Sequence, residues 1–127
     1  MIPRYVFDTG ALISAERGQE RAARFLRLVR RGRARIIVPL PVVAEWWRGR
    51  TALREEMLAA TQVVGSLEIT KAAGVALGHQ RDVDARLTID AIVMATAALM
   101  DAVVITGDTA DFDSLARHFP GVVVLST

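Results

Sequence analysis

The chain has 127 residues, of which 52% are hydrophobic and 24% charged, and it contains no cysteine. This composition excludes a disordered chain, disulfide bonds and metal sites built from thiolates. The formal net charge is only +2, no run of about 18 apolar residues predicts a membrane span, and the N-terminus does not resemble a signal peptide. We therefore expect one globular domain, residues 1–127, that is cytoplasmic and, given its large apolar share, oligomeric.

The first predicted element is a buried strand that ends at an acid. Tyr5 to Phe7 are bulky residues, and Asp8 follows them directly, with Gly10 two places later. Ligands bind at the carboxyl ends of strands in open α/β sheets, so Asp8 is a candidate site residue. Asp8 is also well suited to cap a helix that begins near Ala11, and this stretch taken alone favours the cap. The acids further along the chain are what favour a site.

The rest of the chain alternates between helix and strand patterns. The predicted helices are 11–16, 19–31, one that opens at Pro41, 52–61, 70–80, 89–100 and one that opens at Asp111. The further predicted strands are 35–38, 63–69, 102–105 and 122–125. Such alternation predicts an α/β fold with a mainly parallel sheet covered on both faces by helices.

The predicted helix 89–100 has the most apolar face and carries an acid near its start. Thr88 is the expected N-cap, which places Asp90 in the first turn. A charged loop is predicted before it, from Arg81 to Arg86. These two arginines are candidates for contacts with phosphate, although a solvated loop explains them as well.

Acids recur near the ends of predicted strands and the starts of predicted helices: Asp8, Glu45, Asp90, Asp108 and Asp111. Each has a simpler explanation as a helix cap, a partner of the helix dipole or a solvated residue. Carboxylates that converge from separate segments repel one another unless they are protonated or bridged by cations. Oxygen ligands favour Mg²⁺ or Mn²⁺, and paired ions of this kind promote displacement at phosphorus. The acids therefore predict a metal-dependent nuclease.

Basic residues gather in the N-terminal part of the chain, where Glu20 is the only local acid. They are Arg17, Arg21, Arg24, Arg27, Arg30, Arg31, Arg33 and Arg35. Such an asymmetry is typical of a surface that attracts a polyanion such as RNA. It is also compatible with a solvated helix face or with a docking site for an acidic partner.

The order of these segments resembles a PIN domain and, more narrowly, the VapC toxins of bacterial toxin–antitoxin pairs. The resembling segments are Val6 to Thr9, the helix with Glu45, Thr88 to Ala97, and Ile105 to Phe112. The resemblance implies a three-layer α/β/α fold and Mg²⁺- or Mn²⁺-dependent endoribonuclease activity on structured RNA, such as tRNA or rRNA. It also implies a homodimer and inhibition by a cognate VapB-type antitoxin. A non-catalytic PIN module that binds RNA or a protein partner is the alternative.

The resemblance also assigns roles to individual residues. It places the conserved acids of the family on Asp8, Glu45 and Asp90, with the fourth on Asp108 or Asp111. The expected catalytic residues are Asp8, Glu45, Asp90 and Asp108. The expected metal ligands are Asp8, Asp90, Asp108 and Asp111. Arg81 and Arg86 are the expected RNA-binding residues.

The chain departs from the family pattern at Gly10, where the family often has Ser or Asn. The hydrogen bond from that side chain is missing, and Thr9 or Thr106 can replace it. Two adjacent tryptophans, Trp46 and Trp47, cannot both face the core readily. We expect one of them at a contact with a second copy or an antitoxin.

Two histidines, His79 and His118, are present in the chain. Both fall on predicted helices or at helix ends, so we expect surface or capping roles for them. A water activated by a metal ion needs no histidine as a base.

Overall fold

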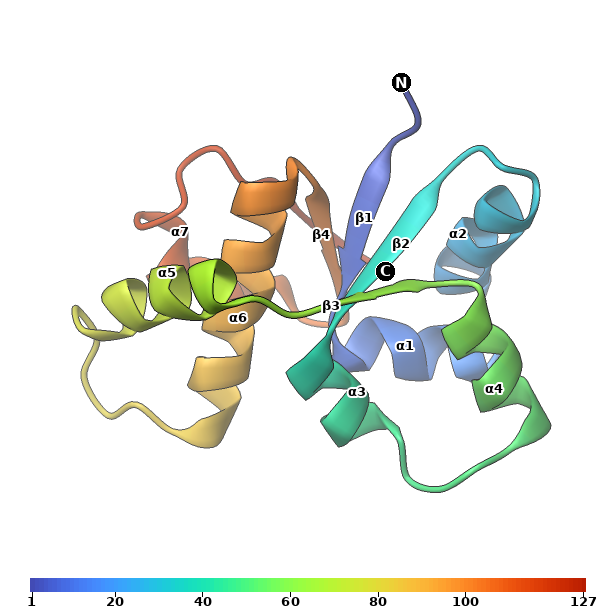
Figure 1. Ribbon diagram of the computed structural model, residues 1–127, viewed down its shortest axis with the longest axis horizontal. Coiled ribbons are helices and arrows are strands. Elements are labelled where there is room, and N and C mark those ends of the chain that lie inside the picture. The colour runs from blue at the N-terminus through green and yellow to red at the C-terminus, as the bar shows by residue number, and fades with distance from the viewer.

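The computed structural model describes residues 1–127 and has an α/β architecture built on a five-stranded sheet (Figure 1). All strand pairs are parallel, and the strand order is β3-β2-β1-β4-β5. The strands are β1 (Arg4–Phe7), β2 (Arg35–Pro39), β3 (Gln62–Val64), β4 (Val103–Thr106) and β5 (Val124–Ser126). The predicted fold class is thereby confirmed.

Helices cover both faces of the sheet and complete three layers (Figure 1). One face carries α1 (Thr9–Glu16), α2 (Glu20–Arg30) and α4 (Ala52–Ala59). The other face carries α5 (Leu67–Leu77), α6 (Ala85–Met100) and α7 (Asp113–Ala116). The short α3 (Leu40–Trp46) and the 3₁₀-helix η1 (Thr109–Phe112) follow β2 and β4 at the carboxyl edge of the sheet. No helix combines the length and the apolar character needed to cross a membrane.

The central position of β1 determines where the loops converge. From β1 the chain passes to β2 and β3 on one side, and later to β4 and β5 on the other. In doubly wound sheets a crevice opens at such a switch point, beyond the carboxyl ends of the strands. Phe7 pairs with Ile105, so the next residues, Asp8 and Thr106, lie beside each other in this crevice.

The strands are continuous apolar runs in the sequence because both of their faces are buried in the core. Ile36, Ile37 and Val38 of β2 are each at most 1% exposed, because helices cover both faces of the sheet. The middle of α6 is also buried nearly all round, since it packs between the sheet and α5. Three alanines, Ala91, Ala95 and Ala97, lie in this buried stretch.

The predicted strand 63–69 is wrong from residue 65 onward. β3 ends at Val64, and α5 begins at Leu67 instead of residue 70. The cause is Ser66, whose side chain accepts a hydrogen bond of 3.1 Å from the backbone nitrogen of Ile69. A serine cap of this kind stabilises the start of a helix and overrides the β-branched pattern of the segment.

The start of α6 also differs from the expectation. Asp84, not Thr88, is the N-cap, and its carboxylate accepts a 2.8 Å hydrogen bond from the backbone nitrogen of Leu87. Thr88 lies within the helix and donates its hydroxyl to the carbonyl oxygen of Asp84. As a result Asp90 lies in the second turn of α6, and Arg86 lies in its first turn instead of in a loop.

Candidate active site

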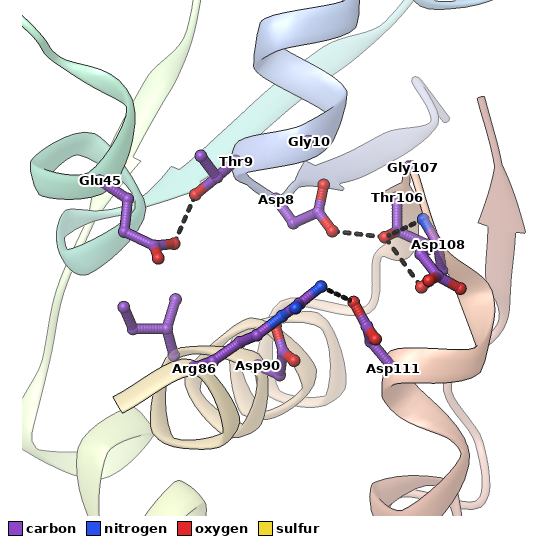
Figure 2. A pocket seen from close by; sticks show the side chains of 11 residues that line it. Asp8, Thr9, Gly10, Glu45, Arg86, Asp90, Thr106, Gly107, Asp108 and Asp111 are labelled. Carbon is purple, nitrogen blue, oxygen red and sulfur yellow. Dashed lines mark hydrogen bonds and ion pairs between the residues drawn. The ribbon is translucent and has the colours of Figure 1, made fainter. Parts of the chain in front are cut away.

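All five acids singled out in the sequence line one pocket at the switch point of the sheet (Figure 2). The pocket has a volume of about 420 Å³. Its charged lining residues are Asp8, Glu45, Asp90, Asp108, Asp111 and Arg86. Since these residues come from the ends of β1 and β4 and from α3, α6 and η1, the fold brings together segments that are far apart in sequence.

Asp8 has both of the roles that its sequence position allows. One carboxylate oxygen caps α1 by accepting a 2.8 Å hydrogen bond from the backbone nitrogen of Ala11. The other accepts a hydrogen bond from the hydroxyl of Thr106, which is 1% exposed. Burial raises the pKa of Asp8 above its ordinary value, whereas these two hydrogen bonds act against that rise.

Glu45 is held by a hydroxyl from a different element. The side chain of Thr9, the first residue of α1, donates a 2.6 Å hydrogen bond to Oε1 of Glu45 on α3 (Figure 2). Thr9 and Thr106 thus each bind one acid of the pocket. These are the two residues expected to compensate for the missing side chain at position 10, and that compensation stays a prediction.

Gly10 lies where the loops after β1 and β4 approach each other. A Cβ atom added there would lie 3.5 Å from the backbone nitrogen of Gly107 and 3.6 Å from Oδ1 of Asp8. Both distances are ordinary van der Waals contacts. Glycine therefore leaves open space beside Asp8, and it is not needed to avoid a clash.

Asp90 is the acid whose charge is least favourable. Its pKa is raised to about 7, mainly by burial and then by the negative charges of Asp111 and Asp8. Because the neighbouring acids make its ionisation costly, a cation placed among them would stabilise the ionised forms. The electrostatics of the pocket therefore favour a positively charged occupant.

Arg86 is the single cation in the lining of this pocket. Its guanidinium lies 2.6 Å from Oδ2 of Asp111, and the side chain is 71% exposed. The hydrogen bond and the charge of Asp111 raise the pKa of Arg86 further. Arg81, the other predicted RNA-binding residue, is exposed and does not line the pocket.

Asp108 and Asp111 are the two candidates for the fourth acid, and their contacts differ. Asp108 caps η1, since its Oδ1 accepts a 3.1 Å hydrogen bond from the backbone nitrogen of Ala110. Asp111 is engaged with Arg86. Both line the pocket, so the choice between them as a ligand stays open.

The donor set of the pocket suits a hard divalent cation, because it consists of carboxylate and hydroxyl oxygens without sulfur or imidazole. No three acidic or histidine side chains converge closely enough to surround one metal ion. Mg²⁺ keeps several of its waters and is often held by only one or two carboxylates. Asp8, Asp90, Asp108 and Asp111 are the residues that could hold such an ion.

A polar network behind Glu45 was not predicted from the sequence. The indole nitrogen of Trp46 donates to Oε1 of Glu16 at 2.9 Å, and Nε of Arg54 donates to Oε2 at 3.0 Å. These contacts join α1, α3 and α4. No local sequence signal reveals them, because the partners are 30 and 38 residues apart.

The remaining aromatic candidates lie outside the acidic pocket. Trp46 is 2% exposed, and Trp47 packs edge-on against it, with ring centroids 5.9 Å apart. One tryptophan therefore occupies the core, as expected. His79 and His118 stack on each other with centroids 5.1 Å apart, and neither contributes to the site.

The comparisons with known proteins agree with this architecture. The sequence matches the PIN domain family over residues 5–118. None of the curated proteins matches the chain significantly.

Solved structures supply relatives of similar fold. A VapBC2 complex from Rickettsia felis, bound to a promoter DNA fragment, has 14% identity and a TM-score of 0.71, with 98% of each chain covered. A DNA-bound VapBC from Salmonella typhimurium has 16% identity and a TM-score of 0.63, covering 99% of this chain and 98% of the other. A toxin–antitoxin complex from Klebsiella pneumoniae has 27% identity and a TM-score of 0.61, covering 94% and 95%.

Proposed function

The chain belongs to the PIN domain family, and on that premise we propose that it is a metal-dependent endoribonuclease that cleaves structured cellular RNA. The observation that carries the proposal is the convergence of five carboxylates on one pocket at the switch point of the sheet. A site of this composition binds phosphate poorly on its own, because both partners are negative. With a divalent cation it becomes suited to phosphodiester hydrolysis.

The acids have separate roles in this proposal. Asp8, Asp90, Asp108 and Asp111 would hold Mg²⁺ or Mn²⁺ in the pocket. The bound cation would neutralise the charge that develops on the phosphate and make a water molecule more acidic. Glu45, fixed by the hydroxyl of Thr9, orients the attacking water and accepts its proton.

The arginines at the other side of the pocket position the substrate. Arg86 lies in the pocket lining with its side chain largely exposed. A phosphate of the RNA competes with Asp111 for its guanidinium, which is well shaped for phosphate. Arg81 lies five residues earlier in the chain and contacts the RNA backbone outside the pocket.

The cellular role follows from the kind of complex in which similar folds occur. The Klebsiella pneumoniae structure is a toxin–antitoxin complex, and the Rickettsia felis and Salmonella typhimurium structures are VapBC complexes. We propose that this chain is a toxin that cleaves tRNA or rRNA and thereby arrests translation. In this proposal it forms a homodimer and is neutralised by a VapB-type antitoxin.

A second function is a PIN module that binds RNA or a protein without cleaving it. Two observations favour this alternative: the ion pair between Arg86 and Asp111 within the pocket, and the lack of a ready group of three metal ligands. The two functions differ in whether a metal ion produces RNA fragments.

The test is cleavage of total cellular RNA by the purified chain, free of any antitoxin, with Mg²⁺, with Mn²⁺ and with EDTA. Asp8→Asn is the site variant. Asp101→Asn is the matched control, because Asp101 is exposed at the opposite end of α6 and its left-handed backbone, φ 52°, suits Asn. We expect discrete RNA fragments with either metal. The fragments should be absent in EDTA and with the Asp8→Asn variant, and they should persist with Asp101→Asn. A folded protein that yields no fragments with either metal would support the binding module instead.

A further inference from the structure

A second pocket of about 340 Å³ adjoins the acidic one. The two pockets share Thr9 and Glu45, which are bonded to each other, so they are direct neighbours. The remaining walls come from α1, α3, α4 and the loop between α3 and α4. The wall contains three arginines, Arg17, Arg48 and Arg54, and we call it the arginine pocket.

Only two of these arginines are available to a ligand. Arg54 is 19% exposed and is paired with Glu16, and it also donates to the carbonyl oxygen of Gly49 at 2.8 Å. Glu16 is further satisfied by the indole nitrogen of Trp46. The charges of Arg54 and Glu16 therefore cancel, and both residues serve to hold α1, α3 and α4 together.

Arg17 and Arg48 form no ion pair. Arg17 is exposed at the C-terminal end of α1. Arg48 donates only its Nε, at 2.9 Å to the backbone carbonyl oxygen of Glu45. Both terminal nitrogens of Arg48 remain free, and these are the donors with which a guanidinium binds a phosphate in bidentate fashion.

The negative charge of the acidic pocket favours a cationic site beside it for the rest of an RNA strand. Five carboxylates face a single arginine there, and that arginine is already paired with Asp111. RNA carries a negative charge at every nucleotide, so the phosphates on either side of the reacting one need positive partners. Arg86 lies in the wall formed by α6, whereas Arg17 and Arg48 lie beyond Glu45, toward α1 and α4.

We propose that the arginine pocket binds a phosphate of the RNA backbone next to the phosphate that is cleaved, with Arg17 and Arg48 as its ligands. This assignment rests on the proposed nuclease function. Nε of Arg48 is bonded to the backbone carbonyl oxygen of Glu45, so the terminal nitrogens of Arg48 bind the phosphate close to Glu45. Binding of the RNA at this point therefore also fixes the strand relative to the proposed general base.

The lining favours a nucleic acid over an acidic peptide as the occupant. Only two of the eight lining residues are hydrophobic, and Trp46 is buried with its indole nitrogen already bonded. Peptides and proteins bind mainly through apolar and aromatic anchors in well-packed pockets, which this surface lacks. A polyanion needs only exposed cations in a polar setting.

The first test compares two double variants that remove the same charge. Arg17→Gln with Arg48→Gln alters the arginine pocket. Lys71→Gln with Arg117→Gln is the matched control, because these exposed cations form no ion pair, lie outside the N-terminal cluster of arginines, and are carried by α5 and by the end of α7 on the other face of the sheet. The readout is fluorescence anisotropy of a labelled RNA hairpin in EDTA, at several salt concentrations, so that cleavage does not interfere.

The pocket variant is expected to bind the hairpin at least about tenfold more weakly and to lose about 0.7 from the slope of log K against log salt, the value for one lost phosphate contact on a single strand. The control is expected to change affinity less than about threefold. An equal loss of RNA affinity in both variants would show that only the overall charge matters, and it would overturn the assignment. Unchanged RNA affinity in the pocket variant would also overturn it. The same holds if Arg17 and Arg48 bind poly-glutamate more tightly than RNA.

A second set of measurements separates this proposal from the nuclease itself. Arg17→Lys with Arg48→Lys keeps the charge but loses the bidentate geometry, so an intermediate affinity is expected even if the Gln variant folds poorly. With Mg²⁺, the pocket variant should raise KM by a larger factor than it lowers kcat. If the wild type binds the hairpin through these arginines but cleaves nothing, the nuclease proposal fails and the phosphate site stands. If the wild type cleaves and the variant keeps the wild-type KM, the phosphate site fails alone.

Discussion

The hydroxyl of Thr9 lies 2.6 Å from Oε1 of Glu45, so the first residue of α1 fixes the acid carried by α3. Thr106 binds Asp8 in the same manner at the end of β4. Two acids of the pocket are therefore oriented by threonines, one at the start of α1 and one at the end of β4. This relationship allows the acids to be perturbed without being removed.

Replacing Thr9 with Val should free the side chain of Glu45 while preserving the shape of the residue. Loss of partners that orient active-site ligands typically reduces activity by about 10–100-fold, and we expect a decrease in kcat of about tenfold. Thr9→Ser keeps the hydroxyl and should retain most of the activity. Steady-state cleavage of a defined RNA measures both variants, and equal activity of Thr9→Val and Thr9→Ser would contradict a role for this contact.

Replacing Thr106 with Val should raise the pKa of Asp8. The hydrogen bond from Thr106 stabilises the ionised carboxylate and lowers its pKa, so its removal acts in the same direction as burial. Because the site needs Asp8 ionised, the acidic limb of the profile of kcat/KM against pH is expected to move to higher pH. Thr106→Ser is the control, and a limb in the same place for both variants would refute the argument.

The raised pKa of Asp90 predicts how stability depends on pH without a metal. Between an ordinary value near 4 and about 7, the folded protein binds more protons than the unfolded chain. The free energy of unfolding contributed by this group therefore falls as pH rises through that window, and it levels off above it. Asp90→Asn removes this dependence.

The difference between Asp90→Asn and the wild type is the quantity to measure. Urea unfolding in EDTA at pH 5, 6, 7 and 8 should show Asp90→Asn gaining stability relative to the wild type as pH rises. Asp101→Asn should show no such trend. A constant difference at all four pH values would mean that the burial of Asp90 has no energetic consequence.

The cap of α6 can be identified by two alanine variants. Asp84→Ala removes the hydrogen bond to the backbone nitrogen of Leu87 and should lower the free energy of unfolding by about 0.5–2 kcal/mol. Thr88→Ala removes a bond from an exposed hydroxyl to a carbonyl that remains helical, and a smaller loss is expected. Denaturant unfolding decides between them, and a larger loss for Thr88→Ala would restore Thr88 as the cap.

The sequence was sufficient for those parts of the fold that depend on local patterns. A buried run such as Ile36 to Val38 predicts a strand in a covered parallel sheet, and each acid at a strand end predicts a place at one edge. Because Asp8 follows β1 and Asp108 follows the neighbouring β4, the topology brings these two acids to the same edge of the sheet. Their convergence could be expected before the structure was known.

Helix caps and contacts between distant segments could not be predicted from the hydrophobic pattern. Caps decided the boundaries of α5 and α6, since Ser66 and Asp84 satisfy backbone nitrogens that the hydrophobic pattern does not count. The link of Glu16 to Trp46 and Arg54 depends on side chains from three helices. The arginine pocket, created by the same packing, has no sequence signal beyond a general excess of arginine.

The central claim is that the carboxylate pocket binds a divalent cation that RNA cleavage requires. The most direct measurement is a Mn²⁺ titration that follows metal binding by electron paramagnetic resonance and cleavage of RNA in the same samples. We expect binding and cleavage to reach half-saturation at the same Mn²⁺ concentration, to be lost together in Asp90→Asn, and to persist in Asp101→Asn. Cleavage that continues in EDTA, or Mn²⁺ binding unchanged by Asp90→Asn, would contradict the claim.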